Sequence, residues 1–282
     1  MEEAYLGVDI GSISTKGVII DKNYKILASE YIWTEGDPMG AARKLIELLE
    51  KQFDKEKYQI VATGTTGSAR KLVGAMLGAT MVKNEITAHA VGTTTLYPDV
   101  RTILEIGGQD SKFISLKDGE VADFQMNKIC AAGTGSFVEE QAARMGIPIS
   151  EFGPLALASK NPSELGERCT VFIETAIASA KSAGASQADI AAGLCHAIVR
   201  NYLHKVVGTK KVGDHIVLQG GVDYNPGIVA AFQSAYGDKV TVSPVFSISG
   251  AYGASLLAYE SVGIKVGESG KPEKESTFLG FD

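Results

Sequence analysis

Two cysteines stand just ahead of stretches with helical character. Cys130 lies in MNKICAAGTG, residues 126–135, and Cys169 lies in GERCTVF, residues 166–172. A thiolate at the start of a helix is stabilised by the helix dipole and by unpaired backbone N–H groups. The same placement suits an anionic iron–sulfur cluster held by cysteines. Two cysteines are too few to hold such a cluster, whereas a two-fold dimer would supply four.

A carboxylate, a glycine, hydroxyls and a lysine follow one another where the first predicted strand ends. The residues are Asp9, Gly11, Ser12, Ser14, Thr15 and Lys16. Glycine lets backbone N–H groups approach a phosphate, the hydroxyls can donate hydrogen bonds to it, and the carboxylate can hold a hydrated Mg²⁺. The spacing differs from that of a Walker A loop. An ordinary polar hairpin is the competing interpretation.

The same arrangement recurs in the second half of the chain. A strand-ending carboxylate is again followed by glycines and polar side chains, here Glu105, Gly107, Gly108, Gln109 and Asp110. This repetition favours a phosphate-binding function over two unrelated hairpins. A third turn, residues 219–226, ends another strand, and its Gly220, Gly221 and Asn225 could hold a base and ribose against bare backbone.

Two similar runs of predicted elements must position these turns. The first run has strands over 5–10, 17–20 and 26–33, a helix over 41–53 and a strand over 59–63. The second has strands over 102–106, 111–117 and 121–125, helices over 134–145, 171–182 and 188–207, and then a strand, helix, strand and helix over 215–219, 227–235, 240–242 and 251–262. Two copies of a strand–turn–strand unit that opens an α/β half indicate duplication.

Composition and charge limit the classes of function. The chain has 282 residues, enough for two domains, and a net charge of −6 that offers no electrostatic footprint for nucleic acid or an anionic membrane. No apolar run reaches the length of a membrane span, and the first residues lack the basic region of a signal peptide. Three cysteines do not make a disulfide framework, so we expect a reducing cytoplasm. Cys195, beside Leu194 and Ile198 in a predicted helix, is expected to be a buried small hydrophobe.

The three turns, in this order, resemble the phosphate and adenosine motifs of the actin, sugar-kinase and heat-shock-chaperone ATPase superfamily. Gly133-Thr134-Gly135 and residues 248–253 look like its two connecting motifs, and the resemblance covers nearly the whole chain, from about residue 6 to 262. The resemblance implies two duplicated RNase H-like α/β domains with a nucleotide cleft between them. The expected domains are residues 1–125 and 126–262, followed by a poorly ordered tail over 263–282.

The segments around the two cysteines, residues 127–137 and 169–172, resemble the activators of 2-hydroxyacyl-CoA dehydratases, which are related to the ATPase subunits of benzoyl-CoA reductase. This resemblance implies that Cys130 and Cys169 hold one 4Fe–4S cluster across a homodimer. It also implies that Mg²⁺-ATP binding and hydrolysis drive a low-potential electron from ferredoxin or flavodoxin to a partner dehydratase or iron–sulfur reductase, with sensitivity to oxygen.

One residue departs from the superfamily pattern. Members commonly have aspartate where Glu105 stands, so the longer side chain leaves direct metal contact open, and Gln109 and Asp110 become equal candidates for orienting the attacking water. Two other functions compete with electron transfer. A sugar kinase of the same superfamily would have no use for paired cysteines at helix starts, and a non-catalytic ATP-binding regulator would need no cluster. Iron and acid-labile sulfide content separates the electron-transfer function from both alternatives.

Overall fold

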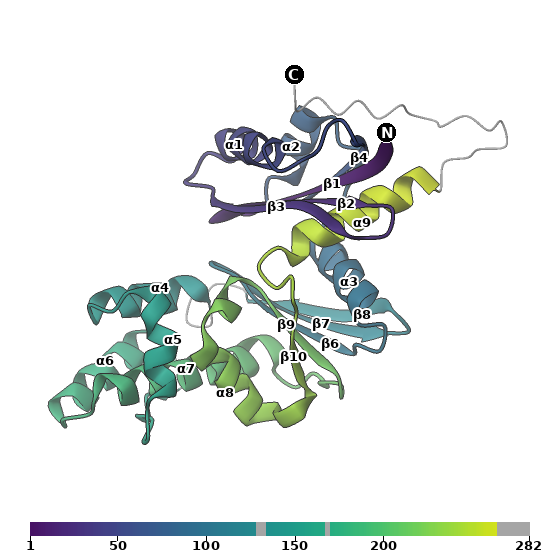
Figure 1. Ribbon diagram of the computed structural model, residues 1–282. Coiled ribbons are helices and arrows are strands. Elements are labelled where there is room, and N and C mark those ends of the chain that lie inside the picture. Colours follow the sequence, from purple (N-terminus) through teal and green to yellow (C-terminus); the bar gives the residue numbers. More distant parts are fainter. Residues whose placement is uncertain (128–133, 167–169, 264–282) are drawn as a thin grey trace. The chain divides into compact units, whose positions relative to one another are not determined.

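The chain forms two compact units, each with its own sheet. The computed structural model describes residues 1–127, 134–166 and 170–263 (Figure 1). The first unit consists of residues 1–98 together with the chain from residue 248 onward, and the second consists of residues 99–247. The backbone therefore passes from one unit to the other twice, at 98/99 and at 247/248.

The first unit has a five-stranded sheet in the order β3-β2-β1-β4-β5. Its strands are β1 (Glu2–Ile10), β2 (Ser14–Asp21), β3 (Ile26–Trp33), β4 (Tyr58–Gly67) and β5 (Met81–Val82). β1, β2 and β3 form an antiparallel meander, whereas β4 runs parallel to β1 and β5 runs parallel to β4.

Helices cover both faces of this sheet. α1 (Pro38–Glu50) and α2 (Arg70–Leu77) lie on one face, and α3 (Glu85–Leu96) and α9 (Ser249–Gly263) lie on the other (Figure 1). α9 approaches the strands so closely that a Cβ atom at Gly7 would lie 2.0 Å from the carbonyl oxygen of Ala251. A Cβ at Gly64 would likewise lie 2.1 Å from the oxygen of Ala254. Glycine at both positions is therefore required for α9 to pack on the sheet.

The second unit repeats the first, with the sheet order β10-β9-β6-β7-β8. Its strands are β6 (Thr102–Ile106), β7 (Ser111–Lys117), β8 (Glu120–Met126), β9 (Ile216–Gln219) and β10 (Val240–Val242). β6, β7 and β8 form an antiparallel meander, β9 pairs parallel with β6, and β10 pairs parallel with β9. The strand order and directions match those of the first unit, which confirms the predicted duplication and two-domain α/β fold.

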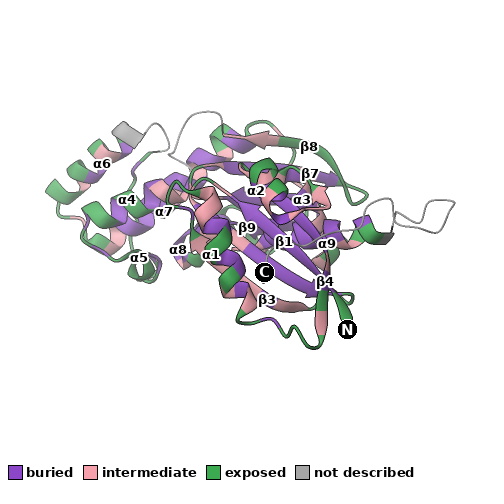
Figure 2. Ribbon diagram, turned by 90° about the horizontal axis from the view of Figure 1, so that it is seen from above, coloured by how far each residue is buried: buried purple, intermediate pink, exposed green. Residues whose placement is uncertain are grey.

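Helices between β8 and β9 distinguish the second unit. They are α4 (Gly135–Arg144), α5 (Ile149–Leu157), α6 (Thr170–Ser182) and α7 (Gln187–Tyr202), which continues into a π-helical turn, η2 (Leu203–Val207). The 3₁₀ turn η3 (Gly221–Tyr224), α8 (Pro226–Tyr236) and the 3₁₀ turn η4 (Gly237–Lys239) then lead from β9 to β10. Each unit has its own hydrophobic core, and β1 and β9 are buried strands in the two units (Figure 2).

The unit boundaries differ from the predicted boundary at 125/126. Residues 99–125 group with the chain that follows them, because β6 pairs directly with both β7 and β9. The last helix, predicted as part of the second domain, packs on β1 and β4 and so belongs to the first unit. The predicted poorly ordered tail lies, from residue 264 on, outside the described residues. Within the described part of the chain, no helix has the length and apolar character needed to cross a membrane.

Candidate nucleotide site

In the first unit, the predicted carboxylate and lysine face each other across two strands. Asp9 is the last residue but one of β1, and Lys16 lies opposite it on β2. The Nζ atom of Lys16 is 3.4 Å from Oδ2 of Asp9. Asp9 is 7% exposed, so its charge is largely removed from water and is balanced by the lysine.

The turn between these two residues is held by its own backbone and by Thr34, the residue that follows β3. The N–H of Gly11 donates to the carbonyl of Ser14 (2.9 Å), and the hydroxyl of Thr34 donates to the carbonyl of Gly11 (2.9 Å). Thr15 is fully buried, and its hydroxyl lies 2.9 Å from that of Thr34. Ser12 is exposed at the tip of the turn, whereas Ser14 is buried. Thr15 therefore supports the turn from inside, and Ser12 lies at its surface.

Two glycines fit closely against the carboxylate of Asp9. A Cβ at Gly67, the last residue of β4, would lie 2.6 Å from Oδ1, and a Cβ at Gly250 would lie 2.6 Å from Oδ2. Gly250 belongs to the first turn of α9, which is part of the predicted connecting motif 248–253. The hydroxyl oxygen of Ser249, the preceding residue, lies 3.2 Å from Nδ1 of the buried His89 on α3. The start of α9 is thus fixed directly against the first carboxylate turn.

The second unit carries the same pair at a shorter distance. Glu105 on β6 lies opposite Lys112 on β7, and the Nζ atom of Lys112 is 2.9 Å from Oε2 of Glu105. The same ammonium group is 2.9 Å from Oδ1 of Asp110. The side chain of Lys112 is 2% exposed. One buried cation therefore holds two of the three polar side chains that the sequence places in this turn.

The backbone of the second turn repeats that of the first and is joined to the helices that follow. The N–H of Gly107 donates to the carbonyl of Asp110 (2.8 Å), as Gly11 does to Ser14. Gln109 is exposed at the tip. The N–H of Gly135, at the start of α4, donates to the carbonyl of Gly107 (2.9 Å). Gly133, also predicted to contact nucleotide, lies outside the described residues.

The third predicted turn follows β9 and lies against the second. Gly220 has a φ of +116°, and a Cβ there would lie 2.2 Å from the carbonyl oxygen of Ile106, so glycine is required. Gly221 opens η3. The side-chain oxygen of Asn225 accepts hydrogen bonds from Gly227 (3.0 Å) and Ile228 (3.3 Å), which caps α8. The side-chain oxygen of Asn225 thus stabilises the start of α8.

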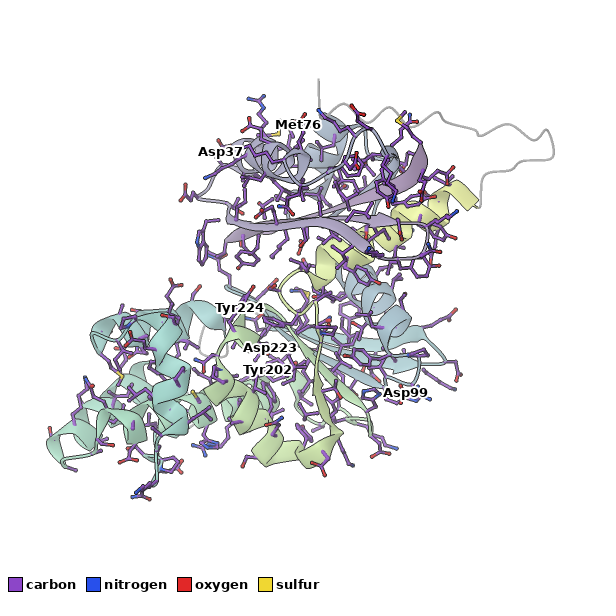
Figure 3. The ribbon with its side chains drawn as sticks, viewed as in Figure 1. Asp37, Met76, Asp99, Tyr202, Asp223 and Tyr224 are labelled. Carbon is purple, nitrogen blue, oxygen red and sulfur yellow. The ribbon has the colours of Figure 1, made fainter. Side chains whose placement is uncertain are left out.

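The sequence interpretation missed three polar residues beside the second turn: Lys112 and Tyr202, which are buried, and Asp223, which is partly buried with its Oδ2 atom fully enclosed. Tyr202, fully buried, donates a hydrogen bond to the carbonyl of Lys112 (2.7 Å), and burial together with the charge of Glu105 holds its pKa well above the usual value. Burial and, secondarily, the charge of Glu105 also raise the pKa of Asp223 far above its ordinary value. Tyr202 and Asp223 are labelled in Figure 3.

Signals for some of these residues are present in the sequence. Lys112 follows Glu105 by the same seven residues that separate Lys16 from Asp9, so the duplication could have pointed to it. Asp223 lies within the third turn that the sequence singled out. Tyr202 carries no such signal, because only the fold brings the end of α7 to the carbonyl of Lys112 on β7.

The two predicted cluster ligands, Cys130 and Cys169, lie outside the described residues. The helices that follow them are as predicted: α4 begins at Gly135, and α6 begins at Thr170. Cys195 is 1% exposed in α7, which confirms the prediction of a buried side chain, and burial raises the pKa of its thiol to about 12. Among the described residues, no three His, Cys, Asp or Glu side chains are arranged to hold a metal ion.

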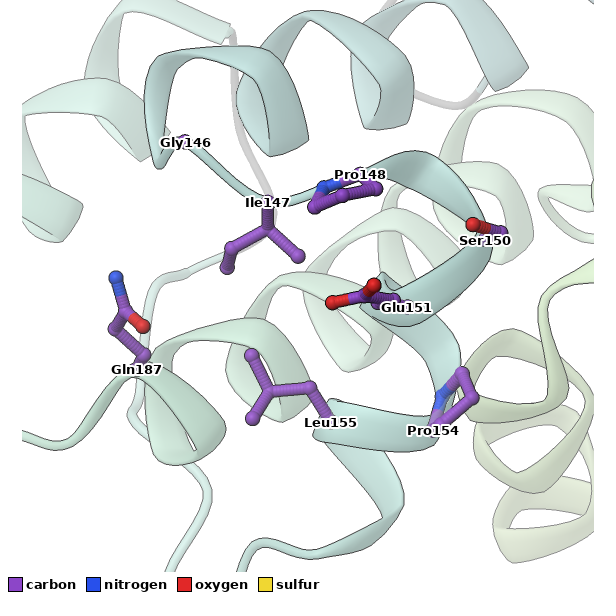
Figure 4. A pocket seen from close by; sticks show the side chains of 8 residues that line it. All are labelled: Gly146, Ile147, Pro148, Ser150, Glu151, Pro154, Leu155 and Gln187. Atoms are coloured by element: carbon purple, nitrogen blue, oxygen red, sulfur yellow. The ribbon is translucent and has the colours of Figure 1, made fainter.

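A separate surface pocket of about 510 Å³ lies in the helical part of the second unit (Figure 4). The α4–α5 connection, α5 and the start of α7 line it. Glu151 and Gln187 are among its polar residues, and Pro148 and Leu155 are among its apolar ones. None of the predicted site residues lines this pocket, so it is distinct from the three turns.

Two units of the same topology, each with a carboxylate–glycine turn after its first strand, define a protein with the actin-like ATPase fold. A ROK-family glucokinase from Streptomyces griseus shares this fold, with a TM-score of 0.56 and 15% identity over 91% of this chain and 99% of the glucokinase chain. The family model for the BadF/BadG/BcrA/BcrD ATPases matches residues 6–258. The chain belongs to this family.

Relatives with assigned functions are similar over almost their whole length. The (R)-2-hydroxyglutaryl-CoA dehydratase activating ATPase of Acidaminococcus fermentans is 34% identical over 90% of this chain and 96% of its own. One of the subunits of the benzoyl-CoA reductase of Thauera aromatica is 28% identical over 89% of this chain and 91% of its own. The solved activator of the 2-hydroxyisocaproyl-CoA dehydratase from Clostridium difficile, with bound ADPNP, has a TM-score of 0.83 and 32% identity over 97% and 99% of the two chains. These comparisons confirm the resemblance seen in the sequence.

Proposed function

We propose that this chain is an ATP-hydrolysing activator that delivers low-potential electrons to a 2-hydroxyacyl-CoA dehydratase or another iron–sulfur reductase. The single observation that carries the proposal is the full-length similarity to activators of such dehydratases. The two matching carboxylate–lysine turns are consistent with it. The likeness to ROK kinases shows the fold alone, so it does not support a sugar-kinase function.

Both turns are proposed to bind the phosphates of Mg²⁺-ATP. Mg²⁺ usually keeps several water ligands and takes only one or two carboxylates from a protein, so a site without three clustered ligands still suits it. Asp9 is the proposed carboxylate of the first turn, and its oxygens lie against Gly67 and Gly250, where no side chain could fit. Lys16 would contribute positive charge toward the phosphates, whereas Lys112, buried between Glu105 and Asp110, would hold the second turn in place. Gln109 and Asp110 are the candidates for orienting water.

Cys130 and Cys169 are the proposed ligands of one 4Fe–4S cluster shared by a homodimer. The described helices α4 and α6, which begin shortly after these cysteines, support this proposal, because a helix start favours negative charge. When bound, the cluster would accept and donate single electrons. Ferredoxin or flavodoxin is the proposed donor. A protein of this kind would operate in an anaerobic cytoplasm and would be sensitive to oxygen.

An anaerobic reconstitution tests the function. The purified chain is mixed with a reductant and with a homologous dehydratase, and dehydratase turnover is measured with and without ATP. We expect turnover that requires ATP and that stops when ADP replaces it. Dehydratase turnover that is equal without nucleotide, or a chain that phosphorylates a sugar while holding no iron, would contradict the proposal.

A further inference from the structure

The second carboxylate–glycine turn, residues 107–111, is hydrogen-bonded to the chain on both sides of the segment 128–133. On the amino-terminal side, the side-chain oxygen of Asn127 accepts from the N–H of Ser111 (2.9 Å), and its amide donates to the carbonyl of Gln109 (3.4 Å). The backbone N–H of Asn127 also donates to the carbonyl of Ser111 (3.1 Å). Asn127 thus closes the far end of the turn.

On the carboxyl-terminal side, the start of α4 holds the near end of the same turn. The N–H of Gly135 donates to the carbonyl of Gly107 (2.9 Å), and the N–H of Ser136 donates to the carbonyl of Gly108 (2.9 Å). The hydroxyl of Ser136 donates to the same carbonyl (2.6 Å). The chain therefore leaves the turn at Asn127 and returns to it at Gly135.

Peptide geometry gives these bonds a direction. A trans peptide is planar, with its N–H and C=O groups on opposite sides. Since the carbonyls of Gly107 and Gly108 point to the start of α4, the N–H groups in the same peptides, on Gly108 and Gln109, point the other way. An anion bound at those N–H groups would polarise the two peptides and strengthen their carbonyls as acceptors, because linked hydrogen bonds reinforce one another.

We propose that Asn127 and Ser136 are positioning residues that transmit the nucleotide state of the 107–111 turn to both sides of the segment carrying Cys130. This inference rests on the proposed function for its cluster, but its mechanical part concerns described residues of one unit only. Phosphate bound at the turn draws the start of α4 tighter to it through the carbonyls of Gly107 and Gly108, and Asn127 links the other end of the same turn to the chain before Cys130. Loss of the phosphate loosens the start of α4 again.

Hydrogen–deuterium exchange on the wild-type chain tests the mechanical part without any need for a cluster. MgADP or a non-hydrolysable ATP analogue at saturation should slow exchange at least fivefold in peptides covering 107–111 and also in those covering 134–138. Peptides of α5, which does not touch the turn, should not change. Protection at the turn with unchanged exchange at the start of α4 would overturn the inference.

Substitutions test the transmission to the cluster. In the full-length protein, purified anaerobically, Asn127→Ala combined with Ser136→Ala should keep iron and sulfide at wild-type content and nucleotide affinity within about threefold. The nucleotide-induced change in the electron paramagnetic resonance spectrum and in chelator accessibility should fall at least fivefold. Ser136→Thr, which keeps the hydroxyl, should retain the wild-type response, and the exposed-site variants Asn23→Ala and Ser150→Ala are matched controls.

The outcomes separate the two proposals. A wild-type chain that binds no iron would contradict the proposed function. The exchange experiment would still test whether the turn and the start of α4 respond together to nucleotide. A folded double variant with the full wild-type response to nucleotide would overturn the inference and leave the function intact. If the double variant does not fold, the single variants and Ser136→Thr give the same comparison.

Discussion

Lys112 lies directly opposite Glu105 in the antiparallel pairing of β6 and β7, with its Nζ atom 2.9 Å from Oε2 of the glutamate. Lys16 has the same position relative to Asp9 in the pairing of β1 and β2. Residues directly opposite each other on one face of a sheet form the closest cross-strand pairs. The duplicated unit has therefore kept a carboxylate–lysine pair together with the turn that joins its two strands, and this pair is the common element of the two proposed phosphate sites.

The pair in the second unit makes a clear prediction about stability. Lys112→Met should lower the free energy of unfolding by about 3–5 kcal/mol, because it leaves buried Glu105 without its cation. Denaturant unfolding in the absence of nucleotide measures this. The exposed pair of Lys239 and Asp214 provides the control, since Lys239→Met should change stability little. Adding Glu105→Gln to Lys112→Met should recover part of the loss, and a single variant as stable as wild type would show that the pair is not a buried ion pair.

The first unit makes a prediction about catalysis. Asp9→Ala should reduce Mg²⁺-dependent ATP hydrolysis at least tenfold, which corresponds to about 1.4 kcal/mol of transition-state stabilisation, because the hydrated metal loses its anchor. A steady-state phosphate-release assay over a range of Mg²⁺ concentrations measures the effect. Asp37→Ala, at the exposed start of α1, is the control. Unchanged turnover in Asp9→Ala would show that this carboxylate is not part of the catalytic site.

The sequence predicts the fold well wherever the pattern is local. The strands around Asp9 and Glu105 alternate or run apolar in the expected way and end in glycine turns, so their positions are confirmed. α3 was missed because its Thr-, Ala- and Gly-rich sequence has no single apolar face, and α5 was missed because it contains Pro154.

The features that sequence reasoning missed depend on contacts between distant parts of the chain. The return of α9 to the first unit is a consequence of its close approach to Gly7 and Gly64, which no local pattern reveals. The burial of Tyr202 beside Lys112 likewise arises from the packing of α7. The site carboxylates and Lys16 could be predicted because they lie around the end of a strand, whereas the burial of Lys112 between Glu105 and Asp110 is seen only in the folded structure.

The cysteines make a prediction about the cluster. Cys130→Ser and Cys169→Ser should each abolish the visible absorbance of a 4Fe–4S cluster, because an isologous dimer loses two of its four ligands with each change. Cys195→Ser is the matched control and should keep the absorbance, since this thiol is buried and its pKa is raised to about 12. Iron and acid-labile sulfide assays on anaerobically purified protein provide the measurement. A normal cluster in either of the first two variants would refute the ligand assignment.

The buried carboxyl group of Asp223 makes a prediction about pH. Its Oδ2 atom has no exposed surface and no hydrogen-bond partner among the residues that the structure describes, and burial and then the charge of Glu105 raise its pKa far above the ordinary value near 4. A carboxyl group of this kind binds its proton more tightly in the folded than in the unfolded protein. The stability it contributes is therefore fully present below pH 4 and is lost as the pH rises from there through the folded pKa.

Replacing Asp223 by a residue that does not ionise should prevent this loss of stability at high pH. Asp223→Asn should raise the free energy of unfolding of the nucleotide-free protein at pH 7, by about 1 kcal/mol or more, because it eliminates the cost of a buried ionisable group. The gain should shrink as the pH falls toward 4. Urea unfolding at a series of pH values measures both effects. Asp214→Asn is the control with the opposite sign, since a hydrogen bond from Lys239 lowers the pKa of Asp214, and this change should not stabilise the protein. A gain for Asp223→Asn that is the same at pH 4 and pH 7 would show that stability is not linked to protonation of Asp223.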